Sequence, residues 1–461
     1  MQIMRRQIQL LYFIFLIYCT SNIELIPQTL KFPPDVEARI KQFEENLSSG
    51  LHDTVKFSIK DRMLKYNIHG ISIAVVNNYE IEWAKGYGLA DTAENKPVTT
   101  ETLFQAGSVS KSLNALGVLK LAQENKIGLN TDINNYLKTW QFPYDMYSKD
   151  KKITIKNLLS HTAGLSIHGY LGYNISESLP SLYQILDGQN PANSNAVRSM
   201  FEPGLKYEYS GGGILISQLI VMDTTHRTYD EYMKENILNP IGMLTSFYTQ
   251  PPPENSKDLL ATAYYVNGQV EGKYHIYPEQ AAAGLWTNPT ELCKYLIEIQ
   301  LSYQNKSNKV LSQEMTKLML TPYIDKTAAL GVFIVDNGSA KYFYHGGSDE
   351  GFISFYIGSI EDGKGVVMMV NSTGSPILTE IFNSVANVYK WKGYYKPTDV
   401  SENSNDEINT IFPNPAIDFI NIKSDETFEQ IFIFDLFGRK VMESPFQTRI
   451  DIRDLNAGAY F

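Results

Sequence analysis

The segments that favour β-strands lie in two distant parts of this 461-residue chain, and their separation restricts the fold more than any other feature. Residues 71–76 and 81–87 are β-rich and are joined by the turn-forming residues 77–80, which predicts a hairpin. Helical and loop-rich sequence follows over 112–300. Further strand-like runs, separated by Asn-Gly, Gly-Gly and Asp-Gly turns, lie at 330–335, 341–345, 352–357 and 365–370. This order predicts an α+β fold whose antiparallel sheet is assembled from both ends of the domain.

The borders of this domain are marked by helical patterns and by a change in composition. Apolar spacing predicts helices over 35–67 and about 377–390. Ser, Asn, Asp and Glu then dominate 396–410, which indicates a linker. Alternating strand and turn signals over 411–461 predict a small C-terminal β-sandwich. We therefore expect a large domain at 30–395, a linker at 396–410 and a small domain at 411–461.

The first 22 residues have the pattern of a secretory signal peptide. Arg5 and Arg6 precede an apolar run from Ile8 to Cys19. This run is shorter than the roughly 20 residues that a helix needs to cross a bilayer. An N-terminal membrane anchor and a lipid-modified Cys19 are the alternatives. No other segment is long and apolar enough to span a membrane, so we expect a secreted or cell-surface protein, with a periplasmic location as the alternative.

The composition disfavours several classes of function. A formal net charge of −10 provides no basic surface for a nucleic acid. The histidines are scattered and no His-Glu-x-x-His motif occurs, so we expect neither a metal nor another cofactor. Cys293 lies in an amphipathic helical pattern and is expected in the core rather than in catalysis.

The segment 104–111 predicts a loop that runs into a helix, with Ser108 in the first turn and Lys111 one turn later. This spacing puts the hydroxyl and the amine on one helical face, where the amine can serve as the base of a serine nucleophile. The start of a helix also favours developing negative charge. A second Ser-x-x-Lys at 148–151 lies among charged residues and is expected to be a solvated loop. Only the first copy is followed by the apolar pattern of a buried helix.

Three other stretches can complete a site with this pair. Tyr209 lies on a tight loop before an apolar helix, and a phenol close to a lysine ammonium can act as a general base. The alternative is one more core tyrosine among the 30 in the chain. His345 precedes two glycines at a strand end, where a backbone N–H can stabilise an oxyanion. The alternative there is a plain hairpin turn. The small residues of 282–287 can line a pocket.

The ordered set Ser108-x-x-Lys111, Tyr209-Ser210-Gly211 and His345-Gly346-Gly347 resembles the serine β-lactamase and penicillin-binding-protein-like superfamily, and especially its class C β-lactamase-related serine hydrolases. The resemblance covers about residues 35–390. Supporting stretches lie at 83–88, 127–137, 158–165 and 282–286. It implies an α+β, β-lactamase/transpeptidase-like fold, with an antiparallel sheet flanked by helices and an all-helical insert.

The resemblance also implies roles for individual residues. Ser108 attacks a carbonyl to form an acyl-enzyme, and Lys111 and Tyr209 share its proton and pass it to the leaving group. The backbone N–H groups of Ser108 and Ser348 form the oxyanion hole. The residues expected to bind the substrate or its oxyanion are His345, Gly346, Gly347, Ser348 and Gly211.

Two departures from the family pattern narrow the expected substrate. Gly211 stands where the family often has an asparagine, and His345 where it often has a lysine that meets a substrate carboxylate. We therefore expect hydrolysis of an ester, an amide or a D-amino-acid peptide bond in a small-molecule or peptide substrate. The alternatives are a true β-lactamase, a D-alanyl-D-alanine carboxypeptidase, or an inactive relative that binds cell-wall or peptide ligands. An α/β-hydrolase is disfavoured because no Gly-x-Ser-x-Gly elbow occurs.

The C-terminal segment carries a second resemblance. The stretches 412–416, 433–441 and 455–461 resemble the C-terminal sorting domain of type IX secretion in Bacteroidetes-like bacteria. This resemblance implies the secretion machinery as a partner. An immunoglobulin-like adhesion module is the alternative.

Overall fold

The computed structural model describes residues 32–51, 53–373 and 376–395, and in the C-terminal part residues 410–412, 418–423, 430–434, 440–453 and 455. The chain divides into the units 1–38 and 39–461, and the second holds the central sheet and the site. The expected signal peptide at 1–22 and residues 396–409 of the expected linker lie outside the described residues.

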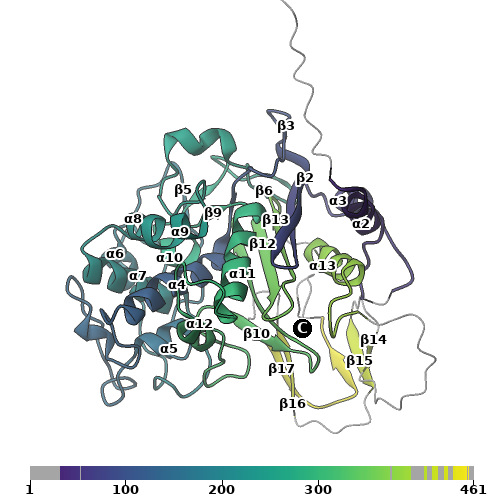
Figure 1. Ribbon diagram of the computed structural model, residues 1–461. Helices are drawn as coiled ribbons and strands as arrows, with labels where there is room; N and C mark the ends of the chain where they lie inside the picture. Colours follow the sequence, from purple (N-terminus) through teal and green to yellow (C-terminus); the bar gives the residue numbers. More distant parts are fainter. Residues whose placement is uncertain are drawn as a thin grey trace, which may run out of the picture. The chain divides into compact units, whose positions relative to one another are not determined.

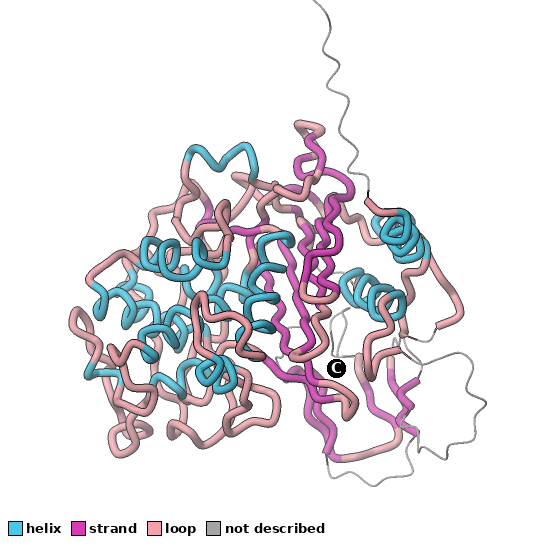
Figure 2. The backbone as a smooth tube through the Cα atoms, viewed as in Figure 1, coloured by secondary structure: helices cyan, strands magenta, loops and turns pink. Residues whose placement is uncertain are grey.

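A seven-stranded sheet forms the centre of the large domain, in the order β10-β11-β12-β13-β1-β2-β3 (Figures 1 and 2). Strand β1 pairs antiparallel with β13, with Ile71 opposite Val370, and so joins the N-terminal hairpin to the C-terminal strands. The expectation of a sheet assembled from both ends is confirmed. The bounds are β1 Gly70–Asn77, β2 Glu80–Asp91, β3 Lys96–Pro97, β10 Phe333–Asp336, β11 Lys341–Asp349, β12 Phe352–Ser359 and β13 Gly365–Val370.

Helices cover the sheet on both faces and form a separate layer beside it (Figure 1). Helix α11 (Pro289–Tyr303) packs on β1 and β13, and α13 (Ile377–Val388) also contacts β13. The helical insert comprises α4 Ser110–Gln123, α5 Ile155–Leu159, α6 Leu182–Asp187, α7 Gly211–Thr225, α8 Tyr229–Met233, η3 Lys234–Leu238, α9 Asn239–Ile241 and α10 Gln280–Ala283. Helix α12 (Gln313–Met319) follows α11 and contacts α4. The predicted helical insert is therefore present.

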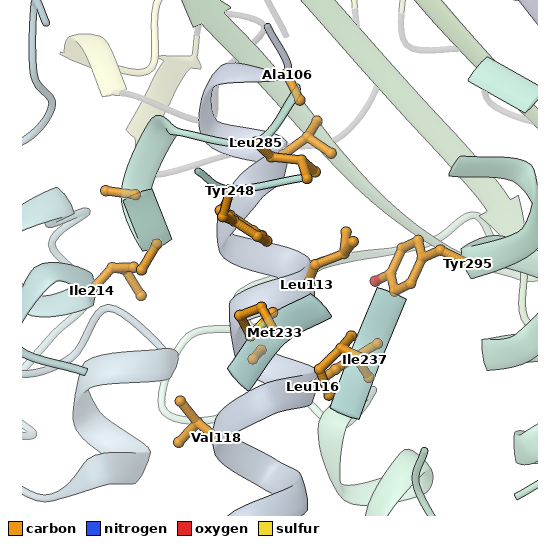
Figure 3. Close-up of a cluster of buried hydrophobic side chains, with 14 of the residues drawn as sticks. Ala106, Leu113, Leu116, Val118, Ile214, Met233, Ile237, Tyr248, Leu285 and Tyr295 are labelled. Atoms are coloured by element: carbon orange, nitrogen blue, oxygen red, sulfur yellow. The ribbon is translucent and has the colours of Figure 1, made fainter. Parts of the chain in front are cut away.

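Helix α4 is the centre of the insert, and most of its side chains are buried. Figure 3 shows Leu113, Leu116 and Val118 of this helix among side chains from several other segments. The neighbours labelled there are Ile214, Met233, Ile237, Tyr248, Leu285 and Tyr295. The residues after Asn114 are mostly apolar, as burial on all sides requires. The buried polar residues Ser112 and Asn114 donate hydrogen bonds to Gly331 O and Ser217 Oγ. The close packing makes α4 a rigid support for the residues at its N-terminal end.

Two local predictions were wrong. The helix expected over 35–67 is two helices, α2 (Pro34–Glu45) and α3 (Ile59–Lys65). Between them Leu47 pairs with Phe57 in a β-bridge, and the Ser58 side chain accepts a hydrogen bond from Asp61 N, which starts a new helix. The Gly-Gly pair at 346–347 is not a turn. Both glycines lie within β11 and pair with β12, and the turn comes at 350–351.

The described C-terminal residues are strands, as expected. β14 (Thr410–Phe412), β15 (Phe419–Lys423) and β18 (Arg449–Asp451) form one sheet. β16 (Gln430–Phe434) and β17 (Lys440–Pro445) form a second. Across the part of the chain that the structure describes, no helix has the length and apolar character needed to cross a membrane.

Candidate active site

The candidate nucleophile Ser108 lies in η1 (Gly107–Val109), a single 3-10 turn that continues into α4. Strand β11 passes directly against this turn. A Cβ atom on Gly107, whose φ is +51°, would lie 2.5 Å from Ser348 N, and one on Gly347 would lie 2.0 Å from Ala106 O. Both positions therefore need glycine for the strand to approach so closely. Ser354 Oγ fixes the contact by donating a hydrogen bond of 2.7 Å to Ala106 O.

Strand β11 has an open side where it reaches the nucleophile. Its pairing with β10 ends at Tyr344, opposite Phe333. From His345 to Asp349 the strand continues to pair with β12. Among the described strands, this end of β11 is thus paired on one side only, and its other side faces the turn that holds Ser108. This placement suits the expected oxyanion role of Ser348 N.

The Ser108–Lys111 pair has the contact that the sequence spacing predicts. Lys111 Nζ donates a hydrogen bond of 2.9 Å to Ser108 Oγ and one of 2.6 Å to Ala282 O, at the end of α10. The lysine is buried, and burial lowers its pKa to about 7, although the carboxyl of Asp349 opposes this shift. A large fraction of the amine is therefore neutral near pH 7 and available to accept the serine proton.

Tyr209 lies beside the lysine, at the end of the loop that precedes α7. Helix α7 begins directly after it, because the Ser210 side chain caps the helix by accepting a hydrogen bond of 2.9 Å from Gly213 N. Tyr209 is buried, and Lys111 Nζ lies 5.2 Å from its ring centroid. The tyrosine is thus both a buried aromatic residue and a neighbour of the Ser-Lys pair.

His161 holds the backbone on both sides of Tyr209. Its carbonyl oxygen accepts a hydrogen bond of 2.7 Å from Glu208 N, and its Nδ1 accepts one of 3.2 Å from Ser210 N. The His161 ring stacks on the Tyr209 ring with the centroids 4.2 Å apart. Burial, with the Lys111 cation nearby, lowers the pKa of His161 well below its ordinary value, so the ring is neutral and Nδ1 remains an acceptor.

We expect replacement of His161 by phenylalanine to lower kcat/KM about tenfold, since the ring stack remains while Ser210 N loses its acceptor. Steady-state kinetics in two backgrounds tests this. If His161 acts through Tyr209, the loss should largely disappear when Tyr209→Phe is already present. An equal loss in both backgrounds would show that His161 acts by another route.

A pocket of about 260 Å³ opens over the nucleophile. Its walls are formed by Ser108, Lys111, His168, Gly169, Tyr170, Tyr209, Ala282, Ala283, Ser348 and Asp349. The pocket thus brings together four of the candidate catalytic and binding residues, Ser108, Lys111, Tyr209 and Ser348. Ala282 and Ala283, from the stretch 282–287 that was expected to line a pocket, also form part of its wall.

The other sequence-derived residues lie around the pocket rather than in its walls. His345 is buried, and its Nδ1 donates a hydrogen bond of 2.6 Å to Gly346 O. Burial lowers the pKa of His345 to about 3, so its ring is neutral at physiological pH. Gly347 allows the close approach to Ala106, and Gly346 pairs with Phe355 of β12. Gly211 begins α7 and donates a hydrogen bond of 3.0 Å to His168 O.

Four wall residues were missed by the sequence analysis: His168, Gly169, Tyr170 and Asp349. His161, which supports the wall, was quoted within a supporting motif but not assigned to the site. Asp349 directly follows Ser348, the expected oxyanion residue, and this position in the sequence could have suggested that Asp349 belongs to the site.

Elsewhere in the chain, the second Ser-x-x-Lys motif does not form a site. Ser148 is buried, contrary to expectation, but Lys151 pairs with Glu202 at 3.0 Å. Cys293 is a buried free thiol, as expected.

The low pKa of Lys111 predicts the pH dependence of the reaction. Because the neutral amine is the base, kcat/KM should rise about tenfold per pH unit below about pH 7 and level off above it. Besides Asp349, the groups that face the amine are Tyr209, His161 and His345, and both histidines are neutral there. A pH–rate profile measured from pH 5 to 9 tests the prediction. A flat profile through pH 7 would contradict it.

The fold and the family match together identify the class of β-lactamase-related serine hydrolases. Residues 40–387 match the family model described as Beta-lactamase, and the chain belongs to this family. Residues 410–461 match a second model, the secretion system C-terminal sorting domain. Both resemblances inferred from the sequence are confirmed, and the second match indicates export through a secretion system.

Known proteins from several organisms are similar to the chain. Protein flp of Staphylococcus aureus strain N315 is 24% identical over 361 residues, which cover 77% of this chain and 70% of that protein. The unguisins hydrolase ungD' of Aspergillus campestris is 28% identical over 235 residues, which cover 49% of this chain and 42% of that protein.

Solved structures show the same fold. The octameric penicillin-binding protein homologue from Pyrococcus abyssi superposes with a TM-score of 0.60 at 22% identity, over 72% of this chain and 78% of that one. The D-amino acid amidase from Ochrobactrum anthropi SV3 superposes with a TM-score of 0.61 at 19% identity, over 77% of this chain and 98% of that one. The β-lactamase/transpeptidase-like fold expected from the sequence is therefore confirmed.

Proposed function

We propose that the protein is an exported serine hydrolase that cleaves an ester, an amide or a D-amino-acid peptide bond through an acyl-enzyme on Ser108. One observation supports this proposal most strongly. The Lys111 amine is buried, has a pKa lowered to about 7, and donates a hydrogen bond of 2.9 Å to Ser108 Oγ. Burying an amine beside a hydroxyl destabilises the charged form and prepares a base for the nucleophile.

In the proposed mechanism, Ser108 Oγ attacks the substrate carbonyl while its proton passes to the Lys111–Tyr209 pair. The backbone N–H groups of Ser108 and Ser348 stabilise the oxyanion of the tetrahedral intermediate. The intermediate collapses, the leaving group takes the proton, and the acyl group remains on Ser108. A water molecule then attacks the ester, and the same pair accepts its proton and returns one to Ser108. The acid product leaves and the free enzyme is restored.

The pocket favours a small substrate without an obligatory carboxylate. Its volume of about 260 Å³ suits an acyl group of modest size. Among the described residues that line the pocket, Lys111 is the one lysine or arginine. Its amine is assigned to proton transfer, so the described part of the pocket wall offers no other such cation for a substrate carboxylate. His345, at the position where the family often has a lysine, is neutral. The similarity to the D-amino acid amidase supports amide substrates, and the similarity to the unguisins hydrolase supports hydrolysis.

A side-by-side rate test distinguishes the substrate classes. Purified protein is offered a short-chain aryl ester, a D-amino acid amide, a chromogenic cephalosporin and a D-Ala-D-Ala peptide, with the Ser108→Ala variant as the control. We expect Ser108-dependent hydrolysis of the ester and the amide to exceed that of the other two. Preferred turnover of the cephalosporin would indicate a true β-lactamase, and preferred turnover of the D-Ala-D-Ala peptide a carboxypeptidase. No turnover of any of them would favour an inactive ligand-binding relative.

We further propose that the C-terminal domain directs the protein to the cell surface or the exterior, with the secretion machinery as its partner. The match of residues 410–461 to a sorting domain supports this location. Cell fractionation with and without residues 410–461 tests it. Loss of the surface and extracellular pools on truncation is expected, whereas unchanged distribution would contradict the proposal and favour a periplasmic location.

A further inference from the structure

Asp349 is a buried carboxyl in the pocket wall that the proposed mechanism does not use. It ends β11, directly after Ser348, and only 6% of its surface is exposed. Its Oδ2 accepts a hydrogen bond of 3.1 Å from Gly107 N, next to the nucleophile. Its Oδ1 is buried and has no partner at hydrogen-bond distance among the described residues, although the Tyr277 side chain is near enough to lower the pKa of the carboxyl. A buried oxygen of this kind is costly unless something binds to it.

The protein supplies little positive charge to balance this carboxyl. Among the described wall residues the only lysine or arginine is Lys111, whose amine is partly neutral near pH 7. Burial raises the pKa of Asp349 well above its ordinary value, and Glu350 nearby adds to the shift. A cation that entered the pocket would offset this burial and would favour the ionised carboxylate.

A second buried carboxyl adds to the acidic character of this side of the pocket. Glu279 is completely buried, and neither of its carboxyl oxygens has a hydrogen-bond partner in the described part of the chain. It directly precedes α10, whose Ala282 and Ala283 line the pocket. Its charge also acts on Tyr170, another wall residue. Burial raises the pKa of Glu279 to about 8. A second buried carboxyl therefore lies directly before the helix that contributes Ala282 and Ala283 to the pocket wall.

The hydrogen bond to Gly107 accounts for only one of the Asp349 oxygens. An asparagine would hold Gly107 N equally well through its amide oxygen, without the cost of burying an acid. Asp349 is one of the residues that line the pocket, where the proposed reaction places the scissile carbonyl. Its location beside both Ser348 and Gly107 places it next to the reacting atoms.

We propose that Asp349 binds a protonated amine that the substrate carries next to the scissile carbonyl. The inference rests on the proposed function and deepens it, because it names the substrate class as amides or esters of acids with a free ammonium group. N-acylated substrates lack the ammonium group that would donate a hydrogen bond to Asp349 Oδ1. A charge-assisted hydrogen bond of this kind is among the stronger ones in proteins.

A pair of substrates that differ only in the amine tests the inference. D-Alanine p-nitroanilide carries the ammonium group, and propionic acid p-nitroanilide has a hydrogen atom in its place. At a pH where the amine is protonated, we expect the wild type to prefer the first by about 10- to 100-fold in kcat/KM. In Asp349→Asn, which keeps an acceptor for Gly107 N, the preference should fall to about one. Because the preference is a ratio within each variant, a general loss of rate does not affect it.

Glu350→Gln provides the matched control. Glu350 is the next residue along the chain, accepts a hydrogen bond of 2.6 Å from Tyr265 Oη and does not line the pocket. The substrate preference should survive in this variant. A wild type without preference for the amine, or an Asp349→Asn variant that keeps it, would overturn the inference.

Fluorophosphonate labelling of Ser108 separates this inference from the proposed function. Labelling without an amine preference rejects the Asp349 assignment and leaves the serine hydrolase intact. Absence of both labelling and hydrolysis rejects the proposed function, and the Asp349 inference with it. If the Asp349→Asn variant is insoluble, a protection experiment on the wild type tests the inference instead. It measures how well a small molecule prevents the labelling of Ser108. D-Alaninol, which has an ammonium group, should then protect at a concentration at least tenfold lower than 1,2-propanediol. Equal protection would reject the inference.

Discussion

Replacement of Lys111 by alanine is expected to slow acylation of Ser108 by about 10²- to 10⁴-fold. Among the described residues, the amine is the one basic nitrogen that forms a hydrogen bond with Ser108 Oγ, at 2.9 Å, and burial has already lowered its pKa to about 7. Without it, the serine must lose its proton to Tyr209 or to water. The rate constant of inactivation by a fluorophosphonate, measured with excess reagent, reports this step directly and does not depend on the physiological substrate.

A second lysine of the same helix serves as the control for this substitution. Lys120 lies farther along α4 and forms a surface ion pair of 3.5 Å with Glu124. Lys120→Ala should leave the acylation rate close to that of the wild type. Full-rate acylation of Lys111→Ala would contradict the assignment of the amine as the base. The rise in rate through pH 7 should also be absent from Lys111→Ala, since it reports the titration of this amine.

The Tyr209→Phe variant is expected to lose about 10²- to 10³-fold in the rate of acylation. The substitution removes the hydroxyl and retains the ring that stacks on His161, so the packing of the loop should be preserved. In the proposed mechanism the phenol shares the serine proton and delivers it to the leaving group. The loss should therefore be larger for an amide, whose leaving group must be protonated, than for an aryl ester.

Tyr207→Phe is the control for the loss of a buried hydroxyl. Tyr207 lies two residues earlier, packs against Phe333 with ring centroids 6.3 Å apart, and does not line the pocket. Its replacement should change kcat/KM little for either substrate. Equal losses for Tyr207→Phe and Tyr209→Phe, or equal losses on ester and amide, would count against proton delivery by Tyr209.

The sheet was predictable because its strands carry strong local signals. The run at 71–76 and the run at 365–370 are rich in β-branched residues, and they pair as β1 and β13. The prediction of one helix over 35–67 was wrong because the spacing of apolar residues does not show where one helix ends and a capping residue starts the next. Ser58 starts α3 with its side chain, while Leu47 pairs with Phe57. The Gly346-Gly347 pair resembled a turn because the reason for glycine at 347 is its close approach to Ala106, which is remote in sequence.

The sequence predicted only those features of the candidate site that follow from the spacing and the order of its motifs. Ser108 and Lys111 meet because they lie one helical turn apart. The role of His161 depends on the backbone beside Tyr209, and the environment of Asp349 depends on η1 and on the pocket. The lowered pKa of Lys111 is a consequence of burial, which the sequence motif does not contain. These properties arise from contacts between distant segments and require the folded chain.

Mass-spectrometric mapping of a fluorophosphonate adduct tests the central claim, acylation of Ser108, most directly. The full chain is treated with the reagent, digested and sequenced by tandem mass spectrometry, beside the Ser108→Ala variant. One adduct on Ser108, absent from Ser108→Ala and formed slowly in Lys111→Ala, is the result that we predict. An adduct on a different residue, or labelling that persists in Ser108→Ala, would contradict the assignment of Ser108 as the nucleophile.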